Sequence, residues 1–260
     1  MVFHTTPGAS TNIVEDFALN EGTADIMAQL TTAFANNPMV PLTYTMGSQI
    51  DPQRPFRFMY NPQLCASNVP STCSSDIAPD LNCYNSNLFA KFGQMPVSEE
   101  LGTDGLQYTF AGPLNHWFYL LAEGSNPAGF PASPTCDGSI LTGLGIKTAG
   151  QIWYQALLRK TTNWTYPAAR SATLNGALQL FPGSCTVFDK VKAAWNAVSV
   201  PALADEPTCE APTPTPTATP TPAPTATPIP VPSPFPSQPG VFPSQPGLPK
   251  TGARPFQVRP

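Results

Sequence analysis

The sequence has few charged side chains, which excludes the classes of protein that depend on charge. Only 11% of its 260 residues are Asp, Glu, Lys or Arg, and the formal net charge is −4. A nucleic-acid partner requires clustered Lys and Arg, and the sequence has no basic patch. No apolar run reaches the roughly 18 residues that a membrane span requires. We therefore expect neither a nucleic-acid partner nor a membrane span.

Metal-binding cysteine pairs are also missing. The six cysteines lie at positions 65, 73, 83, 136, 185 and 209, and none belongs to the Cys-x-x-Cys pairs of zinc ribbons. An even count beside a Pro/Thr-rich tail indicates disulfides and a secreted or cell-surface location. Six reduced core thiols are the alternative. The sequence leaves the pairing open, and its first residues have no basic or apolar region typical of a signal peptide.

The composition changes near Cys209, which divides the chain. About half of the 34 prolines follow residue 210, mostly alternating with Thr, Ala and Ser. Proline fixes φ and removes a backbone donor, so such a run favours an extended polyproline II stalk. We expect a folded domain over 1–205 and a low-complexity stalk over 206–260. The stalk contains LPKTG at 248–252, which resembles a sortase signal without the apolar span that should follow it.

The first 51 residues contain no Lys or Arg, yet two carboxylates lie one helical turn apart in a helical pattern over 17–36. Glu21 and Asp25 share a face with small residues, and mixed charges typical of a solvated face are absent there. We expect these carboxylates to face an interior or a cleft, where an unpaired charge is costly; a solvated acidic face is the alternative. The opposite face has a bulky apolar stripe: Leu19, Ile26, Leu30 and Phe34.

Four further segments have helical periodicity, over 112–124, 146–161, 165–181 and 184–200. Pro113 is expected at the start of the first segment, and Ser184 as the N-cap of the last. Residues 37–110 are rich in Pro, Asn and Ser and predict loops with short helical turns. Strand signals are weak. The fold class is therefore mainly α, a helical bundle.

The order of these segments is similar to that of a known enzyme family. The stretches LNEGTADIM, RFMYNP, AGPLNHWFYLLAEG, GLGIKTAGQIWYQALLRKTTNWTYPAARSATLNGALQLF and VKAAWNAV together resemble the C-terminal helical half of thermolysin-like zinc metalloendopeptidases. The resemblance runs from about Phe17 to Val200, around a divergent, cysteine-bearing insert at about 63–100. It implies a bundle like the thermolysin C-terminal domain.

The resemblance implies a role for each matched residue. The family holds zinc with two histidines of an HExxH helix and with the Glu of an N-E-x-x-x-D helix, and water completes the tetrahedron. Glu21 matches that third zinc ligand, and Asn20 precedes it as in the family. Asp25 matches the carboxylate that orients a zinc-binding histidine. Arg57, in RFMYNP, matches the Arg that contacts the substrate carbonyl and supports the Glu; a surface Arg is the alternative.

The HExxH motif itself is absent. The chain has only two histidines, His4 and His116, and the family spacing places the second zinc histidine at about residue 1. We expect a truncated gene or gene model that covers only the helical half and has lost an N-terminal half. Without two of the three ligands, zinc should not be retained. His116 is expected to be a core histidine and His4 an ordinary polar residue at a frayed end.

A second departure concerns the family's oxyanion-binding His, which follows an Asp in the motif D-N-G-G-V-H. This chain has TDGLQYTFAGPLN, one residue shorter, so Asp104 matches the Asp and Tyr108 stands in place of the His. A phenol can donate a hydrogen bond to an oxyanion, or the change marks a lineage that has lost activity. Residues 26–50 contain no Asp or Glu, so no calcium site is expected there.

Two functions remain. The first is the C-terminal half of a secreted zinc endopeptidase that acts on peptide or protein substrates and is inactive as this chain. The alternative is a non-catalytic surface module, used for binding or spacing, on a proline-rich stalk.

Overall fold

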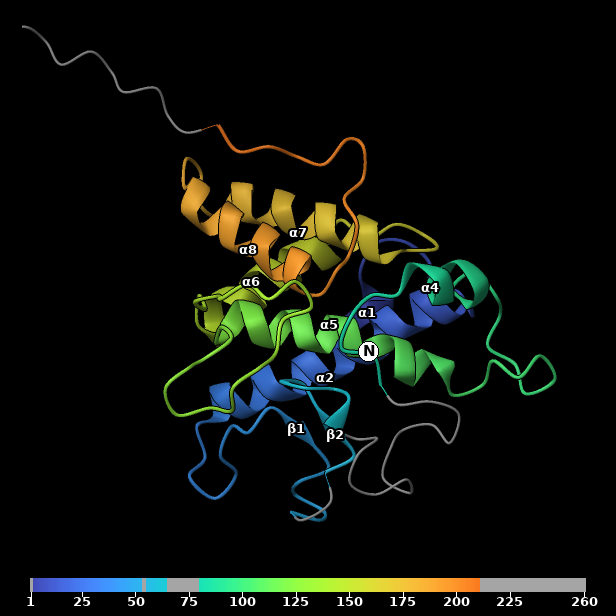
Figure 1. Cartoon of the computed structure of the whole chain (residues 1–260), viewed down its shortest axis with the longest axis horizontal. Helices are drawn as coiled ribbons and strands as arrows, with labels where there is room; N and C mark the ends of the chain where they lie inside the picture. The colour runs from blue at the N-terminus through green and yellow to red at the C-terminus, as the bar shows by residue number, and fades with distance from the viewer. Residues whose placement is uncertain (1, 53–54, 65–79, 211–260) are drawn as a thin grey trace, which may run out of the picture. The chain divides into compact units, whose positions relative to one another are not determined.

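Helices make up most of the regular structure in the residues that the computed structural model describes, which are 2–52, 55–64 and 80–210 (Figure 1). Cys65, Cys73, most of the stalk and LPKTG lie outside them. The described helices are α1 (Val2–Thr5), α2 (Val14–Ala35), α4 (Ser86–Phe92), α5 (Leu106–Ala122), α6 (Ile146–Leu157), α7 (Tyr166–Leu180) and α8 (Cys185–Ala197). The mainly α prediction is confirmed.

A short hairpin of β1 (Thr45–Met46) and β2 (Arg57–Phe58) lies beside α2 (Figure 1). The strands are antiparallel and pair Thr45 with Phe58 and Met46 with Arg57. Gln29 of α2 anchors the hairpin, because its buried amide donates to the Thr45 carbonyl and accepts from the backbone N–H of Tyr44. The sequence predicted only loops with short helical turns over 37–110 and missed this hairpin, which is held by a helix side chain.

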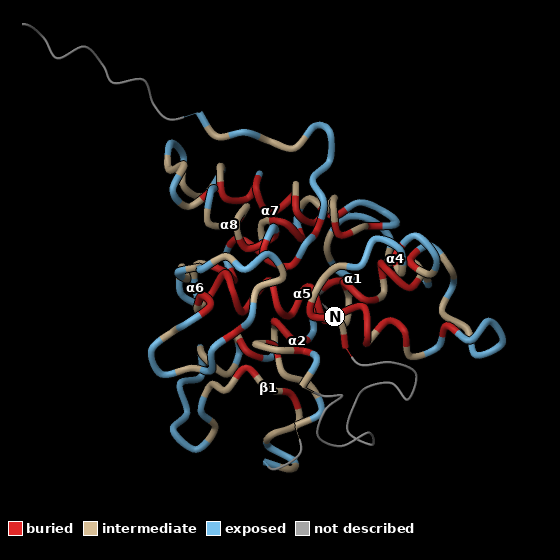
Figure 2. The backbone as a smooth tube through the Cα atoms, viewed as in Figure 1, coloured by how far each residue is buried: buried red, intermediate tan, exposed pale blue. Residues whose placement is uncertain are grey.

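Helix α5 forms the centre of the bundle and contacts α2, α6 and α8. Every residue of this helix except Tyr108 is buried, which is why its backbone is almost continuously red in Figure 2. The segment is apolar nearly all round, a pattern that is typical of a buried helix. The predicted boundary was wrong: α5 begins at Leu106, and Pro113 lies inside the helix rather than at its start.

The backbone around Gly112 and Pro113 explains how proline is tolerated inside α5. Proline has no N–H to donate to the carbonyl four residues earlier, which here belongs to Thr109. The N–H of Leu81 donates to that carbonyl instead, at 3.1 Å. Gly112 permits this approach, since a Cβ there would lie 2.1 Å from the Leu81 carbonyl oxygen. The two residues together seat the segment around Leu81 on the helix.

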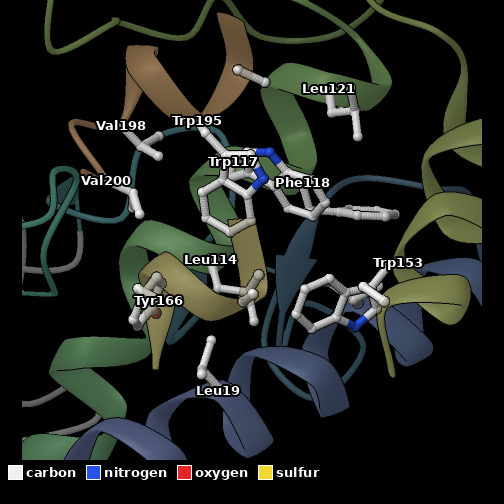
Figure 3. Close-up of a cluster of buried hydrophobic side chains, with 14 of the residues drawn as sticks. Leu19, Leu114, Trp117, Phe118, Leu121, Trp153, Tyr166, Trp195, Val198 and Val200 are labelled. Carbon is white, nitrogen blue, oxygen red and sulfur yellow. The ribbon is translucent and has the colours of Figure 1, made fainter. Parts of the chain in front are cut away.

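An aromatic core ties α5 to α6, α7 and α8 (Figure 3). The rings of Trp117 and Trp195 stack with centroids 4.3 Å apart, and Trp153 lies 5.6 Å from Trp117. Tyr166, at the start of α7, is fully buried and donates its hydroxyl proton to the Phe110 carbonyl. Rings of this size supply much of the apolar area that a domain of about 200 residues buries.

Two disulfides confirm the cysteine prediction for the four cysteines that the structure describes. Cys83 pairs with Cys136, and Cys185 pairs with Cys209. Ser184 occupies the predicted N-cap of α8, although its side chain makes no capping hydrogen bond.

His116 is a core residue, as the sequence predicted. It is fully buried, with Nδ1 2.8 Å from the Asn82 carbonyl oxygen and Nε2 2.9 Å from Ser133 Oγ. Burial lowers the pKa of this imidazole, and hydrogen bonds to the backbone of Asn82 and of Pro134 oppose the shift. A neutral ring with both nitrogens paired has a structural role.

The predicted apolar stripe of α2 does not continue to the end of the helix. Leu19 and Ile26 are fully buried, but Leu30 is half-buried and Phe34 is 92% exposed. Periodicity fixes which face a residue occupies, but the neighbouring elements decide whether that face is covered. The apolar stripe that the sequence predicted is therefore covered at Leu19 and Ile26 and open to solvent at Phe34.

The close approach at Gly112 gives a stability prediction. Gly112→Ala should destabilise the chain by about 3 kcal/mol, because the new methyl group meets backbone that cannot move aside. Gly176→Ala is the matched control inside α7, where the nearest atoms are the Cβ of Gln155 at 3.0 Å and the Ile152 carbonyl oxygen at 3.3 Å, so that a shift of a few tenths of an ångström makes room for the methyl group. The control should change stability by less than about 1 kcal/mol. Urea unfolding followed by tryptophan fluorescence measures both; equal values would contradict the packing described above.

Candidate functional site

A buried ion pair joins α2 to the hairpin. Arg57 Nη2 donates to Asp25 Oδ1 at 3.1 Å, and Nε lies 3.1 Å from Oδ2 as an ion-pair contact that does not have hydrogen-bond geometry. Asn115 of α5 donates to Asp25 Oδ2 at 2.8 Å. Burial raises the pKa of Asp25, and Arg57 and Asn115 oppose that rise. Three separate elements therefore hold this one carboxylate in a fixed orientation.

Glu21 lies one turn before Asp25 on α2, as the spacing predicted. Its side chain is half-buried and makes no hydrogen bond or ion pair with the residues that the structure describes. Burial raises the pKa of Glu21; the charge of Arg57 lowers it, and that of Asp25 raises it further. The carboxylate is therefore available to a cation that approaches from outside these residues.

Tyr108 is brought to the same place. The guanidinium carbon of Arg57 lies 5.6 Å from the centroid of the Tyr108 ring and 5.2 Å from that of Phe56. These are cation–π distances. Tyr108 is also the residue of α5 that is not buried, so its ring faces the edge of the core. The structure thus brings Glu21, Asp25, Arg57 and Tyr108 together from α2, β2 and α5.

Asp104 and Asn20 are placed differently. Asp104 is exposed in the turn before α5, and its side chain makes no contact with Tyr108 or Arg57 within the described ranges. Its proposed role stays a prediction. Asn20 Nδ2 lies 3.4 Å from His4 Nε2. The expected frayed start is instead a helical turn in which Phe3 is buried and its ring is 6.3 Å from that of Trp164.

Sequence reasoning missed Asp80, a second buried carboxylate at this site. It is 1% exposed, and its Oδ1 accepts no hydrogen bond from the described residues. Burial raises the pKa of Asp80 to about 7; Arg57 opposes the rise and Asp25 adds to it. Asp80 belongs to the divergent insert, which has no periodicity to reveal it. Asn115 was also missed, although a polar residue in an otherwise apolar helix was an available signal.

The described residues do not form a complete zinc site. Among residues 2–52, 55–64 and 80–210, no group of three or more His, Cys, Asp or Glu side chains could hold a metal ion. A catalytic zinc centre requires three protein ligands. Glu21 could supply one oxygen ligand, and the others are not provided by these residues.

Asp80 should make stability depend on pH. The folded chain keeps the Asp80 proton up to about pH 7, whereas an unfolded aspartate loses it near pH 4. The unfolded state therefore binds fewer protons between these values, and stability falls as pH rises through this window.

Asp80→Asn removes this titration. We expect the variant and the parent to be similar in stability near pH 4 and the variant to be more stable by at least about 2 kcal/mol at pH 8, at roughly 1.4 kcal/mol per pKa unit. Urea unfolding at pH 4, 6 and 8 tests this, with exposed Asp189→Asn as the control. A constant difference across pH would show that Asp80 does not titrate in this range.

Comparison with known proteins places this geometry in a family. The thermolysin metallopeptidase alpha-helical domain matches residues 14–200. The transglutaminase-activating metalloprotease of Streptomyces mobaraensis is 34% identical over 208 residues, which are 76% of this chain and 24% of that protein. The chain thus spans about a quarter of the length of this relative. No helix within the described ranges is long and apolar enough to cross a membrane. The match over 14–200 agrees with the predicted extent, and the chain belongs to the thermolysin metallopeptidase family through its alpha-helical domain.

Proposed function

We propose that this chain is the helical half of a zinc endopeptidase that hydrolyses peptide bonds in protein substrates. Residues 1–205 form the peptidase domain and 206–260 its stalk. The observation that carries the proposal is the convergence of Glu21, Asp25, Arg57 and Tyr108 from three elements. Glu21, Asp25 and Tyr108 all lie close enough to the Arg57 guanidinium to interact with it.

Glu21 is the zinc ligand that this half contributes. Its carboxylate has no partner among the described residues, and burial raises its pKa. A bound divalent cation would lower the pKa of Glu21 again, because its charge favours the ionised carboxylate. The remaining ligands come from protein outside this chain, because its sequence contains no HExxH.

Asp25 orients a zinc-binding imidazole. Each carboxylate oxygen can accept two hydrogen bonds. Oδ1 accepts one from Arg57 in the structure, while Oδ2 lies within reach of both Arg57 and Asn115. Oδ1 therefore keeps capacity for an imidazole N–H, and the hydrogen bonds from Arg57 and Asn115 fix the direction of the carboxylate. A carboxylate held in this way selects one tautomer and one ring orientation of the histidine.

Arg57 and Tyr108 act on the substrate. The ion pair with Asp25, which includes one hydrogen bond, holds the guanidinium beside the Tyr108 ring. From that position Arg57 binds the substrate carbonyl, and the Tyr108 hydroxyl donates to the oxyanion that develops from a scissile carbonyl. A donor of this kind is typically worth 10²–10³ in rate. Asp104 assists only if its loop moves toward Tyr108.

A secreted or cell-surface location is supported by the two disulfides. The second candidate function is a non-catalytic surface module for binding or spacing. Tyr108 in place of the family's histidine favours it, because that exchange could also follow the loss of selection for catalysis.

The chain alone should be inactive. After dialysis against zinc, the 260-residue protein should retain well below one zinc per chain and should not hydrolyse casein, since one carboxylate ligand cannot hold the ion. Elemental analysis and a casein assay measure these outcomes. Activity that a chelator abolishes would refute the expectation.

Adding a thermolysin-like half that carries HExxH, by co-refolding or fusion, should restore one zinc per complex and chelator-sensitive hydrolysis of casein. Glu21→Gln should abolish zinc retention in that complex, and exposed Glu99→Gln is the matched control. Tyr108→Phe should keep the zinc and lower kcat/KM about 100- to 1000-fold. A complex that retains zinc but hydrolyses nothing would favour the non-catalytic module. Zinc retention unaffected by Glu21→Gln would remove Glu21 from the metal site.

A further inference from the structure

A groove of about 750 Å³ lies beside the hairpin, away from the candidate site. Its walls come from residues between 39 and 49, from residues 52, 55, 58 and 60, and from 129–131, the last of these in the loop after α5. Lining residues include Pro41, Thr45, Pro55, Phe58, Tyr60 and Phe130. We call this the hairpin groove.

The hairpin groove is separate from the carboxylate site. Side chains along an extended strand alternate between faces. Arg57 and Met59 turn toward Asp25 and the core, so Phe58 and Tyr60 turn to the other face and line the groove. None of the four converging site residues lines it.

The residues that line the hairpin groove favour an uncharged partner. None of the described lining residues carries a charge, and three aromatic rings, of Phe58, Tyr60 and Phe130, share the groove with four prolines. A charged peptide would lose hydration there without gaining an ion pair. Aromatic-lined grooves are the surfaces that bind proline-rich segments, whose polyproline II conformation is already extended and rigid.

The rings are held in place before any ligand arrives. Phe58 contacts Tyr60 with centroids 5.7 Å apart, and Tyr60 lies 5.9 Å from Tyr119. Tyr44 makes edge-to-face contacts with Tyr119 at 4.9 Å and with Phe130 at 5.3 Å. This continuous row of rings runs from one wall of the groove to the other. A preformed wall lowers the entropy cost of binding.

One polar group of the groove can donate a hydrogen bond to a peptide backbone. The hydroxyl of Tyr60 makes no hydrogen bond with the described residues. Burial raises the pKa of Tyr60, so the hydroxyl keeps its proton and remains a donor at neutral pH. Polyproline II carbonyls have no internal partners and can accept this bond.

We propose that the hairpin groove binds a proline-rich peptide segment in the polyproline II conformation, with its prolines on Phe58, Tyr60 and Phe130 and one carbonyl on the Tyr60 hydroxyl. The site is distinct from the proposed peptidase centre and needs neither zinc nor the missing ligands. The result of a peptide-binding experiment on this groove therefore does not depend on whether the proposed peptidase function is correct.

The test uses the full 260-residue chain and a fluorescein-labelled peptide, (Ala-Pro-Thr-Pro)₃, followed by fluorescence anisotropy. We expect saturable binding, and at least about tenfold weaker binding of a probe in which every proline is replaced by alanine. Tyr60→Phe keeps the ring and should weaken binding about 3- to 10-fold, the value of one hydrogen bond. Tyr60→Ala should weaken it further.

Tyr154→Phe on α6 is the matched control, because this tyrosine is 49% exposed outside the groove and should leave the affinity unchanged. Thermal unfolding of each variant checks that the fold is intact. The proposal is overturned by any of three results: no saturable binding to the parent chain, equal binding of the proline-free probe, or unchanged affinity in Tyr60→Phe. It is equally overturned if the parent sediments as a dimer that excludes the probe, since a second copy would then occupy the groove.

Discussion

The buried pair of Arg57 and Asp25 is the interaction on which the rest of the site depends. A buried ion pair stabilises a fold little, because desolvation of both charges offsets their attraction, but it fixes geometry. Here one guanidinium faces three carboxylates, Glu21, Asp25 and Asp80, and lowers the pKa of each while burial raises all three. The cluster therefore carries surplus negative charge that protons or an additional cation must balance. That imbalance supports the proposal that Glu21 binds a metal.

The backbone of α5 brings the third carboxylate to this pair. Pro113 leaves the Thr109 carbonyl without its helical donor, and Gly112 opens the space in which Leu81 supplies the replacement. Asp80 precedes Leu81 and is carried against the core by the same contact. A residue that would ordinarily weaken a helix thus docks a loop on it and shapes the electrostatics of the site.

Much of this arrangement could be predicted from the sequence, and the remainder has identifiable causes. The four-residue spacing of Glu21 and Asp25 fixes a shared helix face, and the family register located Arg57 and Tyr108. Helical periodicity did not reveal that Pro113 is inside α5, because the compensating donor comes from a distant segment. Asp80 lies in a divergent insert, where neither periodicity nor resemblance applies.

The hairpin register couples the two faces of β2. Pairing of Thr45 with Phe58 places Arg57 beside Asp25 and turns Phe58 toward the hairpin groove, whose described lining residues are uncharged. A slip of one residue would exchange these faces, burying a phenyl ring against carboxylates and placing a guanidinium among prolines and aromatic rings. Both outcomes are costly, so two chemically opposite environments specify the same register. This constraint explains why strands of only two residues hold a single alignment, and why a weak strand signal still yields an ordered hairpin.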